Sequence, residues 1–594
     1  MSVSSSTVAN DIQLKHRSLA RRFSIQSLIL GLTLAVVSYL VLVPLFMLLY
    51  ASVKSTEDKL PFESTVTSLA NYALVFTSPS MAAIFFDTLL FTAGSLAVGL
   101  PVAILLAWLL ERTAIRGRAW IANAILVPMT IPSLLSAIAW IQLLDPRTGL
   151  VNVVLRNVFA ASSDSGPFDI YSLYGMCFVQ GLRLVPSAYL MIAASFRAMD
   201  PSLEEQSAMA GRSIAQTTFK ITLPIMRPAL LAALIYFIIV VIESFDIPGL
   251  LGFTARIRVL STAIYWATHS EVGLPDYGLA SALGTIILAA ALLLIWIYQR
   301  LTAHQERFAT ITGKGYRPRQ VSLGAWSGAA TAFCLCYIFV AVLLPFVMLL
   351  WTSVQPFYAV PSAESLSRVS FDGYLNIWRD RSVVRAMWNT TVLALVTSVA
   401  TIFLAVLVSW FVVRRQRTGN GLANYLATVS FLPQCVPSIV IGLAFIFVYV
   451  RFPIPIYGTL WIIALALTTR YLAYGSRATT AALMQVHGEL EEASQMSGAP
   501  WTKTLRRITM PLLAPALINV FLWVAVHAMQ ELSMAIMLYN PDTVVVSTMI
   551  WSMWQNGRTS DAAVLGVVLI LLSALLLLGA QAFSFFRGRS QLQP

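Results

Sequence analysis

Long apolar segments recur along the whole chain and constrain its fold more than any other feature. A helix that crosses a membrane needs roughly 20 mostly apolar residues, and runs of this kind occur at 27–49, 88–110, 279–297 and 562–583. Of the 594 residues, 58% are hydrophobic and only 11% are charged, against roughly 25% charged in an average soluble domain. This composition excludes an ordinary water-soluble globule. It predicts an all-α integral membrane protein with about 12 transmembrane helices.

The basic residues lie mainly in short clusters at the ends of these runs, at 15–22, 112–118, 300–319, 414–417 and 587–589. Because cytoplasmic loops carry an excess of Lys and Arg, these clusters place both termini of a multi-pass membrane protein in the cytoplasm. The net charge of +13 is explained by attraction of these clusters to anionic lipid. We therefore expect membrane lipid, and no nucleic acid, as a partner.

The chain contains the same unit twice. PLFMLLYASVK at 44–54 is similar to PFVMLLWTSVQ at 345–355, and VPMTIPS at 127–133 to LPQCVPS at 432–438, 305 residues further along. LEEQSAMAG at 203–211 matches LEEASQMSG at 490–498 with an offset of only 287 residues. The first copy therefore holds about eighteen extra residues, which we place in the loop 145–169 outside the membrane, where insertions are tolerated. Two copies of six spans in the same direction make parallel repeats about an axis along the membrane normal.

The repeat divides the chain into five parts. We expect a cytoplasmic N-terminal tail, a first half with its most typical part at about 86–297, a cytoplasmic linker, a second half with the corresponding part at about 388–583, and a cytoplasmic C-terminal tail. In the same order, the predicted bounds are 1–26, 27–300, 301–323, 324–587 and 588–594.

A polar segment follows the fourth span of each half, at 204–230 and 491–517. In each copy a Glu is followed six residues later by a Gly and thirteen residues after that by an apolar-Pro pair: Glu205, Gly211 and Pro224, then Glu492, Gly498 and Pro511. We expect a short helix that ends at the Gly and a second helix that runs to the Pro. The pattern resembles the EAA loop of ABC-importer permeases, although the first copy reads Glu-Gln-Ser where that family has Glu-Ala-Ala.

The resemblance covers nearly the whole chain, since fused two-copy permeases are typical of the ferric-iron importer subfamily and its thiamine and phosphonate relatives. FDIPGLLG at 245–252, DYGLASALG at 276–284 and MQELSMAIMLYNPDTVVVSTMIW at 529–551 are similar to the iron-type group. The resemblance implies a type I ABC importer fold in the bacterial inner (cell) membrane, two ATPase subunits that dock on the two EAA loops, and a periplasmic or extracellular substrate-binding protein. Ferric ion, a ferric chelate, thiamine and an organophosphonate remain open as substrates.

Charged residues inside spans are costly and usually face a partner or a path. Arg183 and Arg470 occupy equivalent places in the fourth and tenth spans, 287 residues apart. We expect Glu243 and Asp246 in the fifth span, and Gln530 and Glu531 in the eleventh, to lie opposite them. These groups form either the gate or lining of a central pathway, or buried ion pairs that fix helix packing.

An ion-coupled secondary transporter with the same arrangement of six plus six spans is the alternative, with Glu243, Asp246 or Glu531 as the coupling group. A membrane-embedded enzyme has little support, because no nucleophile or metal-ligand cluster stands out. The phosphate loop G-x-x-x-x-G-K-[ST], which holds the phosphates of ATP in many ATPases, does not occur in the sequence. We therefore expect no catalytic residue, metal or cofactor in this chain, with ATP and Mg²⁺ bound by the partner ATPase.

Overall fold

The computed structural model describes residues 25–54, 61, 63–159, 163–200, 202–269, 275–302, 321–416, 421–451 and 454–590. The N-terminal tail up to residue 24, linker residues 303–320 and the last four residues lie outside this set. Within the described residues the chain is helical with short connections, and two isolated β-bridges are present. This confirms the predicted all-α class.

The first half contributes six spans. In chain order they are α2 (Ile25–Ser52), α4 (Pro79–Arg112), α5 with η2 (Arg118–Leu126, Val127–Thr130) and α6 (Ser133–Leu144), α8 (Leu173–Ala198), α10 with η3 and α11 (Ile214–Thr217, Thr218–Thr222, Leu223–Ile242), and α14 (Tyr277–Thr302). Shorter helices connect them: α3 (Ala70–Thr77), α7 (Leu150–Val158), α9 (Ser202–Met209), η4 (Pro248–Gly252), α12 (Phe253–Ala255) and α13 (Leu260–Thr268).

The second half repeats this order. Its spans are η6, α15, η7 and α16 (Gly324–Trp326, Ser327–Ile338, Phe339–Leu343, Leu344–Ser353), α19 (Arg381–Gln416), α20 with η8 (Gly421–Phe431, Leu432–Cys435) and α21 (Ser438–Arg451), α22 (Leu460–Met484), α24 with η9 and α25 (Trp501–Thr504, Leu505–Thr509, Met510–Gln530), and α28 (Thr559–Ser590). The shorter helices are α17 (Ala363–Ser367), α18 (Asp372–Asn376), α23 (Glu489–Met496), α26 (Ala535–Leu538) and α27 (Val546–Gln555).

The chain has twelve spans when each span of one half is matched with its counterpart in the other half. Among the described residues, nine helices are long and apolar enough to cross a membrane, and two further helix pairs pass the same test together. The twelfth span is α22, which occupies in the second half the place of α8 in the first. Polar residues such as Arg470 and Arg477 lower its hydropathy. The prediction of about 12 spans in two parallel repeats is confirmed.

The third span of each half is sharply bent, by 96° between η2 and α6 and by 110° between η8 and α21. The cause is local: Ile131 and Val436 are extended, with ψ of 120° and 123°, and each precedes a proline. The ring of a proline disfavours helical backbone at the preceding residue. The repeated motifs VPMTIPS and LPQCVPS are therefore the sequence of this bend.

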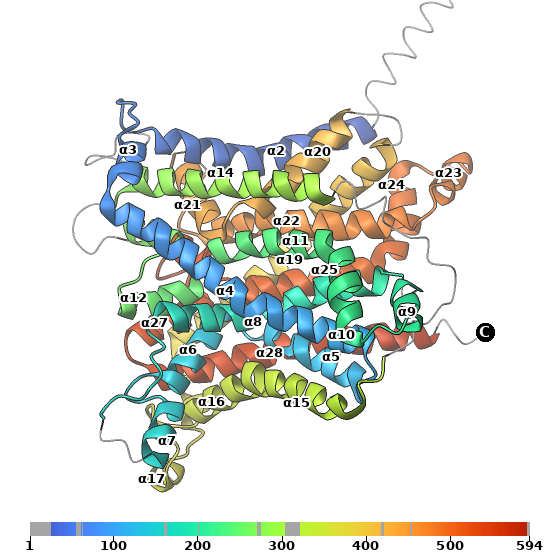
Figure 1. The fold of residues 1–594 in the computed structure, drawn as a ribbon. Helices are drawn as coiled ribbons and strands as arrows, with labels where there is room; N and C mark the ends of the chain where they lie inside the picture. The colour runs from blue at the N-terminus through green and yellow to red at the C-terminus, as the bar shows by residue number, and fades with distance from the viewer. Residues whose placement is uncertain are drawn as a thin grey trace, which may run out of the picture.

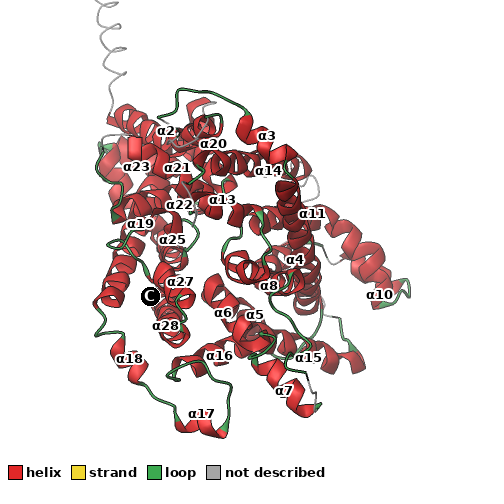
Figure 2. Cartoon of the chain, turned by 90° about the vertical axis from the view of Figure 1, so that its left-hand side faces the viewer, coloured by secondary structure: helices red, strands yellow, loops and turns green. Residues whose placement is uncertain are grey.

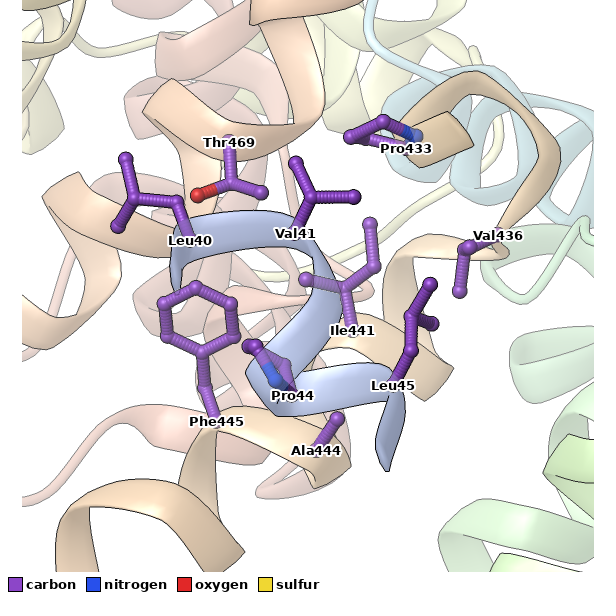
Figure 3. A pocket seen from close by; sticks show the side chains of 10 residues that line it. All are labelled: Leu40, Val41, Pro44, Leu45, Pro433, Val436, Ile441, Ala444, Phe445 and Thr469. Atoms are coloured by element: carbon purple, nitrogen blue, oxygen red, sulfur yellow. The ribbon is translucent and has the colours of Figure 1, made fainter. Parts of the chain in front are cut away.

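The first helix of each half packs against the other half. α2 contacts α20 and α21, and α16 contacts α6, as the end-on view shows (Figure 2). In Figure 3, Leu40, Val41, Pro44 and Leu45 of α2 lie beside the bent span of the second half. This exchange of helices joins the two halves through apolar packing.

One end of the bundle carries α3, α7, α12 and α17, and the opposite end carries α9, α10, α23 and α24 (Figure 1). The loop predicted to hold the extra residues of the first copy contains α7 and lies at the first of these ends. The side-chain amide of Asn152 holds this loop together, because it donates to the carbonyl oxygens of Leu144, Asp145 and Phe168 at 3.1, 3.0 and 2.7 Å.

Candidate functional site

The two EAA loops, 204–230 and 491–517, begin with the same short helix in both halves. α9 is followed by Gly211 with φ of 77°, and α23 by Gly498 with φ of 81°. The amide of Arg212 donates to the carbonyl oxygen of Ser207 at 3.2 Å, which closes the helix end. Positive φ is easily adopted only by glycine. The structure therefore places both glycines at the helix ends where the sequence predicts them.

The second helix of each EAA loop does not end at its proline, which corrects the sequence-based expectation. Pro224 lies near the start of α11, in an unbroken helix from Ile214 to Ile242, and Pro511 lies near the start of α25. A π-helical turn, η3 or η9, directly precedes each proline. A π turn changes the hydrogen-bond register, so the helix tolerates a residue without an N–H and continues into the fifth span.

The consecutive glutamates of the first EAA loop take different directions. Glu204 accepts a hydrogen bond from the Thr222 hydroxyl at 2.6 Å and lies 3.4 Å from Nε of Arg112. Glu205 is partly exposed, and both glutamates line the same groove on the surface. The sequence analysis singled out Glu205 and missed Glu204.

The second EAA loop shows the same division. Glu491 is buried and 3.1 Å from Nη2 of Arg414, whereas Glu492 is exposed. The missed residues had a signal in the sequence: the Glu-Glu pair occurs in both copies, and an Arg ends the second span of each half.

The tips of both EAA loops expose apolar side chains at equivalent positions. Met209 is 80% exposed and Met496 is 89% exposed. Leu203 and Leu490, at the starts of the same helices, are 45% and 49% exposed. Large apolar side chains that are exposed together and recur in both repeats indicate a binding surface.

The two EAA loops differ behind these tips. In the second half, Trp501 is 8% exposed and its ring centre lies 4.9 Å from that of Trp410. The equivalent residue of the first half is Ile214, which is 38% exposed. There a groove of about 640 Å³ remains, lined by Trp108, Ile214 and Met209 among others. The first EAA loop is thus packed less tightly against the spans than the second.

The intramembrane arginines stabilise the bends of the third spans. Nη1 of Arg183 donates to the carbonyl oxygen of Ile131 at 3.1 Å. Nη1 of Arg470 donates to the carbonyl oxygens of Val436 and of Pro433, the latter at 3.0 Å. A bend leaves backbone carbonyls without helical partners, and an unpaired carbonyl within a membrane costs several kcal/mol. Both arginines therefore have a structural role in their own half.

Arg470 also joins the two halves. Its Nη2 lies 2.7 Å from Oε1 of Glu243, a residue of the first half. The position equivalent to Glu243 in the second half is Gln530, whose Nε2 donates to the carbonyl oxygen of Thr130 at 3.1 Å. One side of the pseudo-symmetric centre thus has an ion pair, and the other has a neutral amide.

Two further carboxylates lie near the same turn. Asp246 accepts from the Ser533 hydroxyl at 3.3 Å across the interface between the halves. Glu531 accepts from the amide of Met534 at 3.3 Å and lies 3.5 Å from the hydroxyl of Tyr471.

The sequence analysis placed these acidic residues within the fifth and eleventh spans, and the structure places them after the ends of those spans. α11 ends at Ile242 and α25 at Gln530, so Glu243, Asp246 and Glu531 lie just beyond the helices. Beyond α11, the chain turns at Glu243 and is helical again from Asp246 into η4. A carboxylate at a helix C-terminus is electrostatically unfavourable, and Arg470 offsets this for Glu243.

A search of the described residues for groups of three or more His, Cys, Asp or Glu side chains in a metal-binding arrangement finds none. The acidic residues at the centre are held by Arg, Ser, Tyr and backbone groups instead.

Comparison with known proteins identifies the class. The family model of the binding-protein-dependent transport system inner membrane component matches residues 402–587. The ferric transport system permease protein FbpB of Actinobacillus pleuropneumoniae is 26% identical over 82% of this chain and 68% of its own length. Residues 402–587 are thus similar to this permease family.

Two further relatives and one solved structure are similar to parts of the chain. The putative ferric transport system permease protein FbpB 1 of Haemophilus influenzae is 28% identical over 76% of the permease and 68% of its own length. The Fe(3+)-transport system permease protein FbpB 2 of the same species is 22% identical over 86% and 92%. A solved bacterial ABC transporter that imports alginate covers 45% of the permease at 17% identity, with a TM-score of 0.36.

The matched region 402–587 lies within the second half and contains the second EAA loop. The permease is therefore the membrane component of a binding-protein-dependent ABC importer. This assignment favours the ATP-driven class over the ion-coupled carrier, since the family is defined by an importer of that kind.

Proposed function

We propose that the permease forms the translocation pathway for ferric iron or a ferric chelate. The observation that carries this proposal is the excess of negative charge at the centre, in a chain whose relatives are named as ferric permeases. Three carboxylates, Glu243, Asp246 and Glu531, lie near two arginines, Arg183 and Arg470. Carboxylates are suitable transient partners for a hard cation, and their excess disfavours a phosphonate anion.

Uptake into proteoliposomes that contain the permease, its ATPase and its binding protein tests the substrate. We expect ATP-dependent uptake of ferric iron, and a reduction of about tenfold or more in the variant that combines Asp246→Asn with Glu531→Gln. Asp372→Asn is the control, because it removes an exposed carboxylate outside the spans. Uptake of thiamine or 2-aminoethylphosphonate without uptake of ferric iron would contradict the proposal.

Two ATPase subunits dock on the tips of the EAA loops in this proposal, at Met209 with Glu205 and at Met496 with Glu492. Support comes from the exposure of both methionines and from their equivalent places in the two repeats. The end of the bundle that carries these tips then faces the cytoplasm, and a binding protein delivers substrate at the opposite end. Labelling of Met209→Cys or Met496→Cys from the cytoplasmic side alone is the expected result for this orientation.

Capture of the ATPase tests the docking. Wild type is compared with the double variant Glu205→Ala, Glu492→Ala in nanodiscs, and Glu489→Ala is the control because it removes an exposed carboxylate from the same helix as Glu492. We expect capture to weaken about tenfold in the double variant and to persist in the control. Equal capture by all three would exclude the two glutamates from the docking surface.

A further inference from the structure

Glu204 of the first EAA loop, whose side chain is 15% exposed, is joined to three spans at once. Its carboxylate lies 3.4 Å from Nε of Arg112, the last residue of α4, and accepts from Thr222, just before α11. Nη2 of Arg112 in turn donates to the carbonyl oxygens of Phe196 and Met199, at the end of α8, at 2.9 and 3.3 Å. Glu204 thus connects α9 to the cytoplasmic ends of the second, fourth and fifth spans.

The second half contains the same arrangement. Glu491 accepts from Thr509, just before α25, at 3.0 Å, and pairs with Arg414 near the end of α19. Nη2 of Arg414 donates to the carbonyl oxygen of Val486, just after α22, at 3.2 Å. The indole of Trp410 adds a hydrogen bond to Glu491 at 3.2 Å.

These six residues form two carboxylate junctions, one per half: Arg112, Glu204 and Thr222 in the first, and Arg414, Glu491 and Thr509 in the second. Their side chains are largely buried, with exposures of 6% and 15% for the first Arg-Glu pair and 11% and 5% for the second. Ionised groups removed from water are costly unless they are paired and hydrogen-bonded. The repetition of such a costly arrangement in both halves indicates a role beyond filling space.

We propose that the carboxylate junctions transmit movement of the EAA loops to the spans. Each junction makes α9 or α23 a rigid extension of three span ends, so that a displacement of the loop by the ATPase moves these spans together. The glutamates Glu204 and Glu491 are positioning residues that act through Arg and Thr, separate from the partly exposed Glu205 and the exposed Glu492. This inference rests on the proposed docking of ATPase subunits on the EAA loops.

The test separates transmission from docking. The double variant Glu204→Gln, Glu491→Gln is reconstituted with ATPase and ferric-loaded binding protein, and Glu205→Gln, Glu492→Gln is the matched comparison. For the first variant we expect ATPase capture within about twofold of wild type and a loss of about tenfold in ferric iron imported per ATP hydrolysed, since a hydrogen-bonded ion pair is weakened. For the second we expect weaker capture. An unchanged yield of iron per ATP in the first variant would overturn the inference.

A milder variant tests the same contact with less risk of misfolding. Thr222→Val with Thr509→Val keeps the shape of the side chain and removes only the hydroxyl that donates to each glutamate. We expect normal thermal stability within about 2 °C and a loss of about threefold in iron imported per ATP.

Exchange of the partners, Arg112→Glu with Glu204→Arg, is expected to restore part of the yield of iron per ATP that Glu204→Arg alone loses. Absence of any restoration counts against transmission through the pair.

The two proposals fail in different ways. If wild type captures no ATPase, the proposed docking is wrong and this inference falls with it. If wild type captures ATPase and the glutamine and valine variants import as much iron per ATP as wild type, docking stands and the carboxylate junctions are structural only.

Discussion

Arginine at 183 and 470 stabilises backbone that the repeated Ile-Pro and Val-Pro bends leave without helical partners. Only Arg470 also carries an ion pair to the other half, because the first half has Glu243 where the second has Gln530. A guanidinium group can serve both purposes since it presents five donors in a fixed geometry. One residue type thus has two roles that differ between the repeats.

The pair between Arg470 and Glu243 predicts a non-additive effect on stability. We expect Glu243→Leu to destabilise the protein by about 2 to 4 kcal/mol, because it leaves a largely buried guanidinium without its carboxylate. Arg470→Met with Glu243→Leu is expected to cost less than the sum of the two single changes. Thermal unfolding in detergent compares both single variants and the double variant with wild type. Additive losses would show that the two groups do not interact.

The difference between Trp501 and Ile214 predicts unequal sensitivity of the two EAA loops. Trp501→Ala is expected to cost about 3 to 5 kcal/mol, because it opens a cavity beside Trp410 and Phe411. Ile214→Ala is expected to cost about 1 kcal/mol or less, since that side chain is 38% exposed. Unfolding temperatures of the two variants check this order, and equal losses would contradict the difference in packing.

Two features of the helices depend on proline in opposite ways. At the bends of the third spans, a proline ends one helix and the next begins beyond it. At Pro224 and Pro511 the helix continues, because a π turn precedes each proline. The sequence alone predicts that a helix ends at the proline in both cases. The helices also continue through Pro44, Pro101 and Pro186, so a proline by itself does not decide whether a helix ends.

The glycines of the EAA loops give a prediction at the scale of the helix. Gly211→Ala and Gly498→Ala are expected to destabilise by about 1 to 2 kcal/mol each, although a Cβ would meet nothing within 4 Å, because a positive φ is unfavourable for other residues. Gly328→Ala, inside α15 and equally uncrowded, is the control and is expected to be neutral or slightly stabilising. Unfolding curves compare the three. A loss for Gly328→Ala equal to the others would mean that φ is not the cause.

Exchange of the first helices makes the whole molecule one unit. α2 shares an apolar cluster with the second half that includes Leu30, Val37, Trp410 and Leu426. Polar bonds cross the same boundary, since Thr352 donates to Oε1 of Gln142 at 3.0 Å and Tyr358 donates to its carbonyl oxygen at 2.7 Å. The halves are joined by these contacts as well as by the linker.

The contacts between the halves predict that the linker can be cut. A protease site inserted between residues 303 and 320 allows cleavage after purification, and we expect the two pieces to remain together in detergent because apolar packing does not depend on chain continuity. Size-exclusion chromatography after cleavage measures this, with uncut protein as the control. Separation of the pieces would show that the linker is needed to hold the halves.

The sequence by itself determined the membrane class, the two parallel repeats, the EAA loops and the glycines that end their first helices. These features depend on hydropathy and spacing over short stretches, which a single chain displays directly. It also identified Arg183 and Arg470 as residues that need a partner.

Only the tertiary structure decided which partners they have. Arg470 and Glu243 are 227 residues apart in sequence, and Glu204, not its neighbour Glu205, turns toward Arg112. Such choices depend on how helices from different parts of the chain pack together, and on the ion pair that makes the burial of one carboxylate acceptable. Local sequence patterns show neither how distant helices pack nor how deeply a side chain is buried. The carboxylate junctions and the packing of α2 and α16 against the opposite halves are therefore visible only in the folded molecule.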